Sequence, residues 1–319
     1  MSFKTKFKHF LYNNELGNDF WGLMHTININ LRRVIPNELY FKRAYVKTHG
    51  ESPDFKNPRT FDEKQLWLKM NYRNPLCTKC SDKYLVREFV KEKGLEHILN
   101  PLFGVYDSAK SINWDELPDR FYIKANHMSA CNVRCNDLST FDKKSAEKIL
   151  GKGMKHDYSL DSREWNYRDI DRKIIAEAII ETDDSLGLVD YRFLCSKGKC
   201  EYIFVDIDTA DDSGNHRHDA RRNIYDNEFN LLDITASRPN FDPSLISKPE
   251  NFEEMLKYAQ ILSKEFPFCR VDFYNVDGKI IFGEITFFHA GGTCDITPKE
   301  WQYKIGDSID ISEELKNFK

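Results

Sequence analysis

The segment that most constrains the fold is a predicted β-hairpin near the C-terminal end of the chain. Two apolar runs, FCRVDFYNV (residues 268–276) and KIIFGEITFF (residues 279–288), flank the dipeptide Asp277-Gly278, which is a strong hairpin signal. Four polar residues interrupt these runs: Arg270, Asp272, Glu284 and Thr286. Burying carboxylates and a guanidinium in such strands costs several kcal/mol unless each has a charged partner or a metal ion. The hairpin is therefore the first candidate for a functional site.

The strand register decides whether these polar groups can act together. A two-residue turn would direct Asp272 and Glu284 to opposite faces of the sheet. A three-residue loop, residues 276–278, would instead place Arg270 opposite Glu284. It would also put Asp272 on the same face as Glu284 and Thr286. We expect the three-residue loop, and two carboxylates converging on one face would suit Mg²⁺, a hard cation that takes oxygen ligands. The alternative is an Arg270–Glu284 salt bridge beside a solvated Asp272.

Elsewhere the chain alternates helix and strand signals. Thr60 and Pro249 precede stretches with apolar residues at helical spacing, residues 61–70 and 252–262. Strand-like runs are expected at residues 121–125, 173–180, 191–195 and 201–207. Helices packed on two mainly antiparallel sheets predict the α+β class.

Composition argues against several classes of protein. The 319-residue chain has a formal charge of -4, whereas proteins held mainly by nucleic-acid phosphates usually present a strongly basic face. No apolar run approaches the roughly 18 residues that span a bilayer, and Lys4, Lys6 and Lys8 interrupt the N-terminal stretch. We therefore expect a cytoplasmic protein that binds no nucleic acid.

Residues 1–48 carry an excess of Lys and Arg interleaved with aromatic residues. This pattern is compatible with a surface helix that touches anionic lipid head groups. The interpretation we prefer is a helical extension folded back onto the main body, since such mixing is common on ordinary amphipathic faces.

The expected location predicts the redox state of the eight cysteines. A cytosolic protein should carry reduced thiols rather than a disulfide framework. Cys77 and Cys80 have the spacing of half a zinc site, but Cys131 and Cys135 are spaced differently. We do not expect a structural zinc site here.

Several spaced motifs carry a family resemblance. The run FCRVDFYNVDGKIIFGEITFFHAGG, with LPDRFYIKANHMSACN and RKIIAEAII before it, resembles the teichuronopeptide-biosynthesis (TupA-like) branch of the ATP-grasp superfamily. The match runs from about Asn57 to Gly292 and includes CSDKYLVREFV, REWNY, DYRFLCSKGK and RRNIYD. Several motifs in the right order are more specific than any one of them.

The resemblance implies an ATP-grasp fold, in which two α/β lobes hold ATP between mainly antiparallel sheets. The implied divisions are an N-terminal helical extension (1–56), a region preceding the ATP-grasp lobes (57–120), a small lobe (121–176) and a C-terminal lobe with the hairpin (177–319).

The same resemblance implies a set of nucleotide-binding residues. Lys124 matches the lysine that reaches nucleotide phosphates, and the loop after it has Met128 and Ala130 where the family tends to have glycines. A hinge whose backbone reads adenine and an acid that binds ribose are implied at Glu177, Ala178, Ile179, Ile180 and Asp184. Arg222 is the implied triphosphate contact, and Arg221 is nearly as good.

On the hairpin, Asp272 and Glu284 match the two Mg²⁺ carboxylates of the superfamily. Thr286 stands where the wider superfamily has Asn, so its hydroxyl is an implied metal ligand. Arg270 matches the arginine that steadies the tetrahedral intermediate in D-alanine:D-alanine ligase-like members. Residues 289–292 should form the acceptor-side loop.

The resemblance implies an ATP-dependent carboxylate-amine ligase that forms an amide through an acyl phosphate, with ATP and Mg²⁺ as cofactors. The implied partners are a uronic-acid-containing sugar or glycan and an amino acid, in surface (capsular, O-antigen or teichuronopeptide) polysaccharide biosynthesis. Polysaccharide-assembly enzymes and a peripheral position at the inner face of the membrane are further expectations. Three alternatives stay open: a sugar phosphotransferase on the same fold, a polysaccharide glycosyltransferase, and a nucleotide-binding protein without catalysis.

Overall fold

The computed structural model describes residues 34–182, 186–210 and 217–318. The chain divides into a short N-terminal unit, residues 1–44, and a main unit, residues 45–319, which carries every feature discussed below except the first part of α3 (Asn37–His49). Asp184 and most of the predicted N-terminal extension lie outside the described residues.

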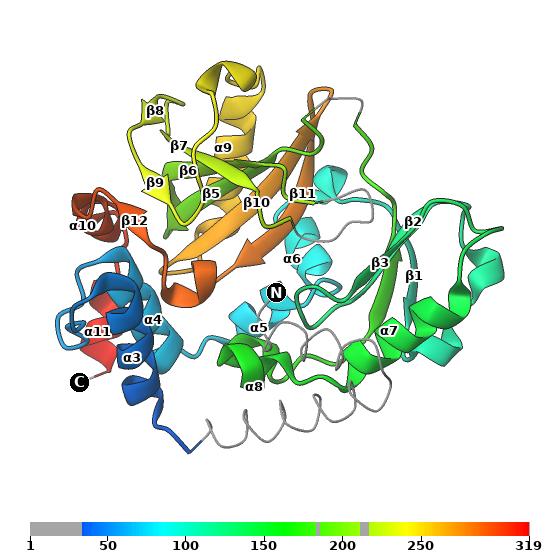
Figure 1. Cartoon of the computed structure of the whole chain (residues 1–319), viewed down its shortest axis with the longest axis horizontal. Helices are drawn as coiled ribbons and strands as arrows, with labels where there is room; N and C mark the ends of the chain where they lie inside the picture. Colours follow the sequence, from blue (N-terminus) through cyan, green and yellow to red (C-terminus); the bar gives the residue numbers. More distant parts are fainter. Residues whose placement is uncertain (1–33, 183–185, 211–216, 319) are drawn as a thin grey trace, which may run out of the picture. The chain divides into compact units, whose positions relative to one another are not determined.

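In the part that the structure describes, the main unit contains three antiparallel sheets. A four-stranded sheet has the order β1-β4-β2-β3, from β1 (Leu102–Tyr106), β4 (Ile174–Glu177), β2 (Phe121–Ala125) and β3 (Asn132–Cys135). A six-stranded sheet has the order β11-β10-β5-β6-β7-β8, from β11 (Lys279–Thr286), β10 (Cys269–Val276), β5 (Asp190–Ser196), β6 (Lys199–Ile207), β7 (Arg221–Asp226) and β8 (Leu231–Leu232). The third sheet pairs β12 (Ile296–Thr297) with β9 (Thr235–Ala236). These sheets and the helices around them confirm the predicted α+β class (Figure 1).

The α-helices of the described residues are α3 (Asn37–His49), α4 (Phe61–Asn71), α5 (Pro75–Ser81), α6 (Val86–Glu92), α7 (Lys143–Lys155), α8 (Tyr158–Ser162), α9 (Phe252–Ser263), α10 (Glu300–Asp307) and α11 (Ser312–Asn317). Short 3₁₀ turns are η1 (Glu96–Ile98), η2 (Ala109–Ser111), η3 (Trp114–Glu116), η4 (Trp165–Tyr167), η5 (Pro243–Leu245) and η6 (His289–Gly292). Thr60 caps α4 as predicted: its side chain accepts from the N–H of Glu63, whose side chain accepts from the N–H of Thr60. None of the helices in the described part of the chain has the length and apolar character needed to cross a bilayer.

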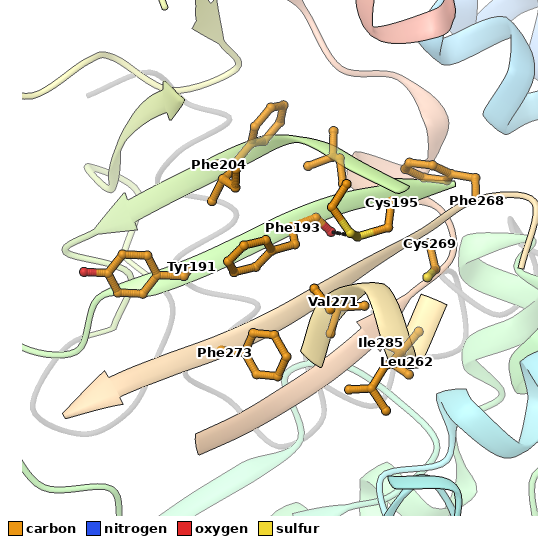
Figure 2. Close-up of a cluster of buried hydrophobic side chains, with 14 of the residues drawn as sticks. Tyr191, Phe193, Cys195, Phe204, Leu262, Phe268, Cys269, Val271, Phe273 and Ile285 are labelled. Atoms are coloured by element: carbon orange, nitrogen blue, oxygen red, sulfur yellow. Dashed lines mark hydrogen bonds between the residues drawn. A yellow bond between two sulfur atoms is a disulfide. The ribbon is translucent and has the colours of Figure 1, made fainter. Parts of the chain in front are cut away.

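One face of the six-stranded sheet is apolar and packs against α9. Phe193, Val271 and Ile285 are at most 2% exposed and belong to one cluster with Leu262 of α9 (Figure 2). Because side chains alternate along a strand, the residues between them point to the opposite face. The large apolar cluster therefore supports a second face on which polar groups are collected.

The hairpin of β10 and β11 corrects the predicted loop. Val276 pairs with Lys279, so the connection is the two-residue turn Asp277-Gly278 and the three-residue loop was wrong. Both turn residues have positive φ, 52° and 74°, as expected for the Asp-Gly turns that match the twist of a hairpin. The register then shifts at Gly283, so that Asp272 lies opposite Glu284. Arg270 lies opposite Thr286, not opposite Glu284 as predicted.

The turn between β5 and β6 corrects the cysteine prediction. Cys195 and Cys200 form a disulfide across this hairpin, with Cα atoms 4.2 Å apart. The argument from cellular location could not take account of this pairing, because strand register alone makes the two residues neighbours. The remaining cysteines, Cys77, Cys80, Cys131, Cys135, Cys269 and Cys294, are buried free thiols.

A close contact between α10 and the start of α4 gives a stability prediction. A Cβ atom on Gly306 would lie 2.1 Å from the carbonyl oxygen of Arg59, a backbone atom that cannot move without displacing the N-cap of α4. We expect Gly306→Ala to lower the free energy of unfolding by about 1–3 kcal/mol or more, measured by urea denaturation. Gly151→Ala in α7 is the matched control, since its Cβ would meet nothing within 4 Å and alanine favours a helix. Equal stability of the two variants would contradict the described packing.

Candidate functional site

The second face of the six-stranded sheet carries a dense group of charged side chains. Cross-strand pairing aligns Glu284, Asp272 and Arg192 in one row, since Glu284 lies opposite Asp272 and Asp272 opposite Arg192. A parallel row contains Asp190, Asp206 and Arg222. The sheet thus brings residues from β5, β6, β7, β10 and β11 onto one surface, although they are far apart in the sequence.

Asp206 is the centre of one half of this group. Its side chain is fully buried and accepts from Arg222 at both oxygens, from Nε at 2.5 Å and from Nη2 at 2.7 Å. Arg192 and Arg238 approach the same carboxylate at 3.0 and 2.7 Å. Burial alone would raise the pKa of Asp206, but these guanidinium groups, Arg192 foremost, lower it to about 2. The carboxylate is therefore ionised at neutral pH and stabilises three cations.

The hairpin carboxylates form the other half. Asp272 and Glu284 do share one face, as predicted, but the bulge at Gly283 brings this about and not the loop length. Arg270 lies between them: its Nε and Nη2 donate to Asp272 at 2.7 and 2.5 Å, and Nη2 also donates to Glu284 Oε1 at 2.9 Å. The salt bridge of the alternative interpretation is thus present, but Asp272 is buried at 4% exposure and not solvated. Thr286 donates to the same Glu284 Oε1 at 2.8 Å.

The charge state of the two carboxylates suits a hard cation. Burial raises the pKa of Asp272 to about 6 against the opposing effect of Arg270 and Arg192, so the group is still mainly ionised at neutral pH. Arg270 and Lys83 lower the pKa of Glu284, whose side chain is 47% exposed, to about 2.

The carboxylate oxygens of Asp272 and Glu284 suit a Mg²⁺ ion that takes its other ligands from nucleotide phosphates and water. Among the described residues, no group of three or more His, Cys, Asp or Glu side chains is arranged to hold a metal ion. Mg²⁺ typically takes only one or two carboxylates, and phosphate oxygens and waters complete its shell. Within the described part of the chain, Glu284 Oε2 takes no hydrogen bond, so it is open to such an ion. Asp272 and Glu284 therefore fit a Mg²⁺ ion that shares their carboxylate oxygens with Arg270.

Two lysines mark the side of the site that would receive phosphates. Lys83, between α5 and α6, donates from Nζ to the carbonyl of Met128 at 2.7 Å and from its N–H to the carbonyl of Asn126 at 3.1 Å. These two hydrogen bonds fix the position of the loop after β2 at Asn126 and Met128. Burial lowers the pKa of Lys83, and the charges of Glu284 and Lys124 also act on it. Lys124 on β2 forms an ion pair with Glu177 on β4.

The loop that departs from the family pattern has an unusual backbone conformation at one of the departures. Ala130 has φ = 59°, in the left-handed region where glycine is least strained. Position 130 thus has a backbone conformation that favours glycine, and alanine adopts that conformation in this chain.

The predicted hinge is partly engaged with its surroundings. Ala178 donates its N–H to the carbonyl of Pro101 at 2.9 Å and accepts from the Asn100 side chain at 2.7 Å. In the described residues, the peptide groups of Ile179 and Ile180 have no such partner, and both residues are half-buried. A nucleotide base would therefore find hydrogen-bonding groups at Ile179 and Ile180 sooner than at Ala178.

Arg222, the implied triphosphate contact, is deeply buried. It is 3% exposed, is held by Asp206, and stacks on Phe204 with 4.8 Å between the guanidinium carbon and the ring centroid. It would contact a phosphate only by giving up part of this arrangement. Arg221 is more exposed and is held by Asp208 at 2.7 Å.

Sequence reasoning missed several members of the site. Asp190, Arg192 and Asp206 interrupt apolar strands just as Arg270 and Asp272 do, so the criterion applied to the hairpin would have found them on β5 and β6. His289, which the resemblance placed only in the acceptor-side loop, lies in η6 and contacts Arg222 of β7 and Arg270 of β10. No local pattern marks that residue.

No curated protein matches the chain in sequence. Among solved structures, D-cycloserine synthetase is similar with a TM-score of 0.43 and 12% identity, over 77% of this chain and 72% of that one. D-alanine–D-alanine ligase from Bacillus anthracis gives 0.42 and 14%, over 75% and 69%. L-amino acid ligase from Bacillus licheniformis gives 0.41 and 13%, and the chain spans 70% of its own length but only 48% of that ligase.

The family model gives the decisive match. The model described as TupA-like ATP-grasp matches residues 63–310, which include most of α4, the loop after β2, the hinge and the hairpin. This range is well over half of the chain and contains the charged face described above. The chain therefore belongs to the TupA-like ATP-grasp family.

Proposed function

We propose that the protein is an ATP-dependent carboxylate-amine ligase that forms an amide through an acyl phosphate. The observation that carries the proposal is the contact of Arg270 with both Asp272 and Glu284, within a hairpin that the family match covers. In such a reaction a carboxylate oxygen attacks the γ-phosphorus of ATP and ADP leaves. An amine then attacks the acyl carbon and phosphate leaves.

The lysines would act on the nucleotide. We assign Lys124 and Lys83 to the phosphates, because Glu284 and Lys124 are both among the charges that act on Lys83 and a lysine ammonium is a flexible point charge suited to phosphate. The backbone of Ile179 and Ile180 would bind the adenine, and Asp184 is kept as the ribose contact. Arg222 would act mainly by supporting the charged face.

Asp272 and Glu284 would hold Mg²⁺, with Thr286 beside Glu284 to orient it or a bound water. The ion would neutralise charge on the transferred phosphoryl group. Arg270, adjacent to both carboxylates, would then donate to the oxyanion that forms as the amine attacks.

We infer the substrates from the chemistry that gives the family its name. Teichuronopeptide synthesis joins amino acids to uronic acids, so we assign a uronic acid carboxyl, free or in a glycan, and an amino acid amine. We therefore propose a role in surface polysaccharide biosynthesis, with a cytoplasmic site of action and contact with assembly enzymes at the inner membrane face.

A screen of amino acids against uronic-acid-bearing sugars for ADP release tests this proposal. Hydroxylamine added without the amine should trap the acyl phosphate as a hydroxamate. A stable sugar phosphate as the sole product would show a phosphotransferase instead, and absence of ADP with every pair, in the presence of ATP and Mg²⁺, would count against catalysis.

Nucleotide binding gives a separate prediction. ATP with Mg²⁺ should raise the melting temperature, because a ligand selective for the native state stabilises it by about 2.7 kcal/mol at a hundredfold excess over Kd. Lys124→Ala and Glu284→Gln should each reduce this shift, by roughly half if Kd rises tenfold. In addition, chelation of the metal should reduce the shift in the wild type and much less in Glu284→Gln.

The matched control is Lys173→Ala, since Lys173 pairs with Asp107 at 2.6 Å on the surface beside the same sheet. Its shift should equal that of the wild type. An unchanged shift in both Lys124→Ala and Glu284→Gln would remove the assigned site.

A further inference from the structure

His289 is a buried side chain with a guanidinium group at each ring nitrogen. It is 3% exposed and is the first residue of η6, directly beyond the hairpin. Arg270 Nη1 lies 2.8 Å from Nδ1, and Arg222 Nη1 lies 3.3 Å from Nε2. The residue thus lies between the two halves of the charged face, and beyond its expected place in the acceptor-side loop no role has been assigned to it above.

The chemistry of the ring decides which contact is a hydrogen bond. Burial, and after it the charges of Arg222 and Arg270, lowers the pKa of His289 well below its usual value, so the ring is neutral. A neutral imidazole has one acceptor nitrogen and one N–H donor, and a guanidinium only donates. The shorter distance assigns Nδ1 as the acceptor from Arg270. Nε2 then carries the proton and faces Arg222 without accepting from it.

The position of the ring is fixed from several sides. Phe204 meets it edge-on with 5.2 Å between centroids, and Phe61 lies at 6.2 Å. Lys69 on α4 donates to the carbonyl of Gly291 at 3.0 Å, which ties η6 to that helix. A Cβ atom on Gly292 would lie 2.8 Å from Leu66, so the turn fits closely against α4. The acceptor atom is therefore held in place by elements outside the hairpin.

Arg270 has three partners, and His289 is the uncharged one among them. Its Nε and Nη2 atoms are directed at Asp272 and Glu284, the carboxylates assigned to the metal, whereas Nη1 is directed at His289. A cation bound to those carboxylates would compete with Arg270 for their oxygens. The contact with His289 does not involve a metal ligand and would persist.

We propose that His289 is a positioning residue whose Nδ1 holds the Arg270 guanidinium in the orientation used for acyl transfer. This inference rests on the proposed function, since it assigns Arg270 to the acyl centre. It goes beyond that function because it makes a turn anchored on α4 responsible for the geometry of the oxyanion contact.

Two substitutions at the same position test the role. His289→Leu removes the acceptor and should lower the rate of amide formation about 10- to 100-fold, as expected for loss of a hydrogen bond to a charged group. The KM for ATP and the rate of hydroxamate trapping should change little. His289→Asn should recover most of the amide rate, because its side-chain oxygen can take the place of Nδ1. In an Arg270→Ala background, His289→Leu should have no further effect.

A control separates positioning from general stability. His49 is a buried histidine that contacts Asp62 at 2.8 Å, so His49→Leu should lower the melting temperature without changing the ratio of amide to hydroxamate. If His289→Leu behaves in the same way, or if His289→Asn is no better than His289→Leu, the positioning role is wrong.

Ring-nitrogen NMR of the metal-free protein gives a readout that does not depend on activity. His289 should be neutral with Nδ1 unprotonated, and the Arg270 Nη signals should move in His289→Leu. A proton on Nδ1 would overturn the inference even if the enzyme is a ligase. Conversely, a wild-type protein that makes no hydroxamate would refute the proposed function, and the NMR result would still decide whether His289 holds Arg270.

Discussion

Replacement of Arg270 by alanine should reduce amide formation about 100- to 1000-fold, because loss of one oxyanion donor typically has an effect of this size. The guanidinium is nearly fully buried and is directed at both hairpin carboxylates and at His289, so water cannot replace it in the same geometry. ATP binding, measured by the thermal shift with Mg²⁺, should suffer much less. The phosphate contacts are assigned to Lys124 and Lys83.

Two further variants sharpen this test. Arg270→Lys keeps the charge but not the fork of donors, and should recover only part of the activity. Arg120→Ala removes an arginine that is half-exposed and pairs with Glu181 at 2.9 Å. It should leave both the rate of amide formation and the ATP-induced thermal shift unchanged. Loss of ATP binding in Arg270→Ala as large as the loss of amide formation would show that Arg270 serves the nucleotide and not the acyl centre.

The largest expected effect on stability is that of Asp206→Asn. Its carboxylate contacts the guanidinium groups of Arg222, Arg192 and Arg238 and is fully buried. The neutral amide would leave three cations without their shared anion, and removal of one partner from a buried ion pair costs about 3–5 kcal/mol. Urea denaturation at neutral pH measures this loss.

Asp219→Asn is the matched control for Asp206→Asn, because Asp219 has the same two-bond contact with an arginine but is exposed. Asp219 also accepts from two nitrogens of one arginine, Arg217, at 2.9 and 2.6 Å, but its side chain is 68% exposed. Solvent screens such a pair, so this variant should be nearly as stable as the wild type. Equal losses in the two variants would mean that burial does not set the strength of the Asp206 contacts.

The pH dependence of the same pair of proteins tests the charge assignment. The folded-state pKa of Asp206, about 2, lies below its ordinary value of 3.8. Its stabilisation is therefore fully present above about pH 4 and is lost as the pH falls toward 2. The wild type should lose its advantage over Asp206→Asn across this interval. A constant difference between the two proteins would indicate that Asp206 is not held ionised by its arginines.

Much of the fold could be predicted because the relevant signals are local. The capped start of α4 and the strands of the central sheet follow from single residues and short apolar runs. The hairpin register was missed although its signals were present. Asp277-Gly278 favours a two-residue turn, and Gly283, whose Cβ would lie 3.0 Å from the carbonyl oxygen of Asp272, marks the bulge.

The spatial grouping of site residues could be predicted from the sequence only where all of them belong to one segment. Arg270, Asp272, Glu284 and Thr286 belong to one hairpin, so their common face follows from that segment once the bulge is known. The arrangement around Asp206 depends on the order of β5, β6 and β7 in the sheet, which alternation along each strand does not determine. The disulfide of Cys195 and Cys200 likewise depends on pairing between strands.

The most direct test of the central claim is to follow a heavy-oxygen label from the carboxylate substrate. If the γ-phosphoryl group is transferred to that carboxylate and the amine then displaces phosphate, one labelled oxygen must leave with the phosphate. Mass spectrometry of the phosphate released with ATP, Mg²⁺, a labelled uronic acid and an amino acid should therefore show one labelled oxygen per phosphate, in step with amide formation. Release of unlabelled phosphate while amide accumulates, or recovery of the phosphoryl group on a sugar hydroxyl, would contradict the acyl-phosphate mechanism.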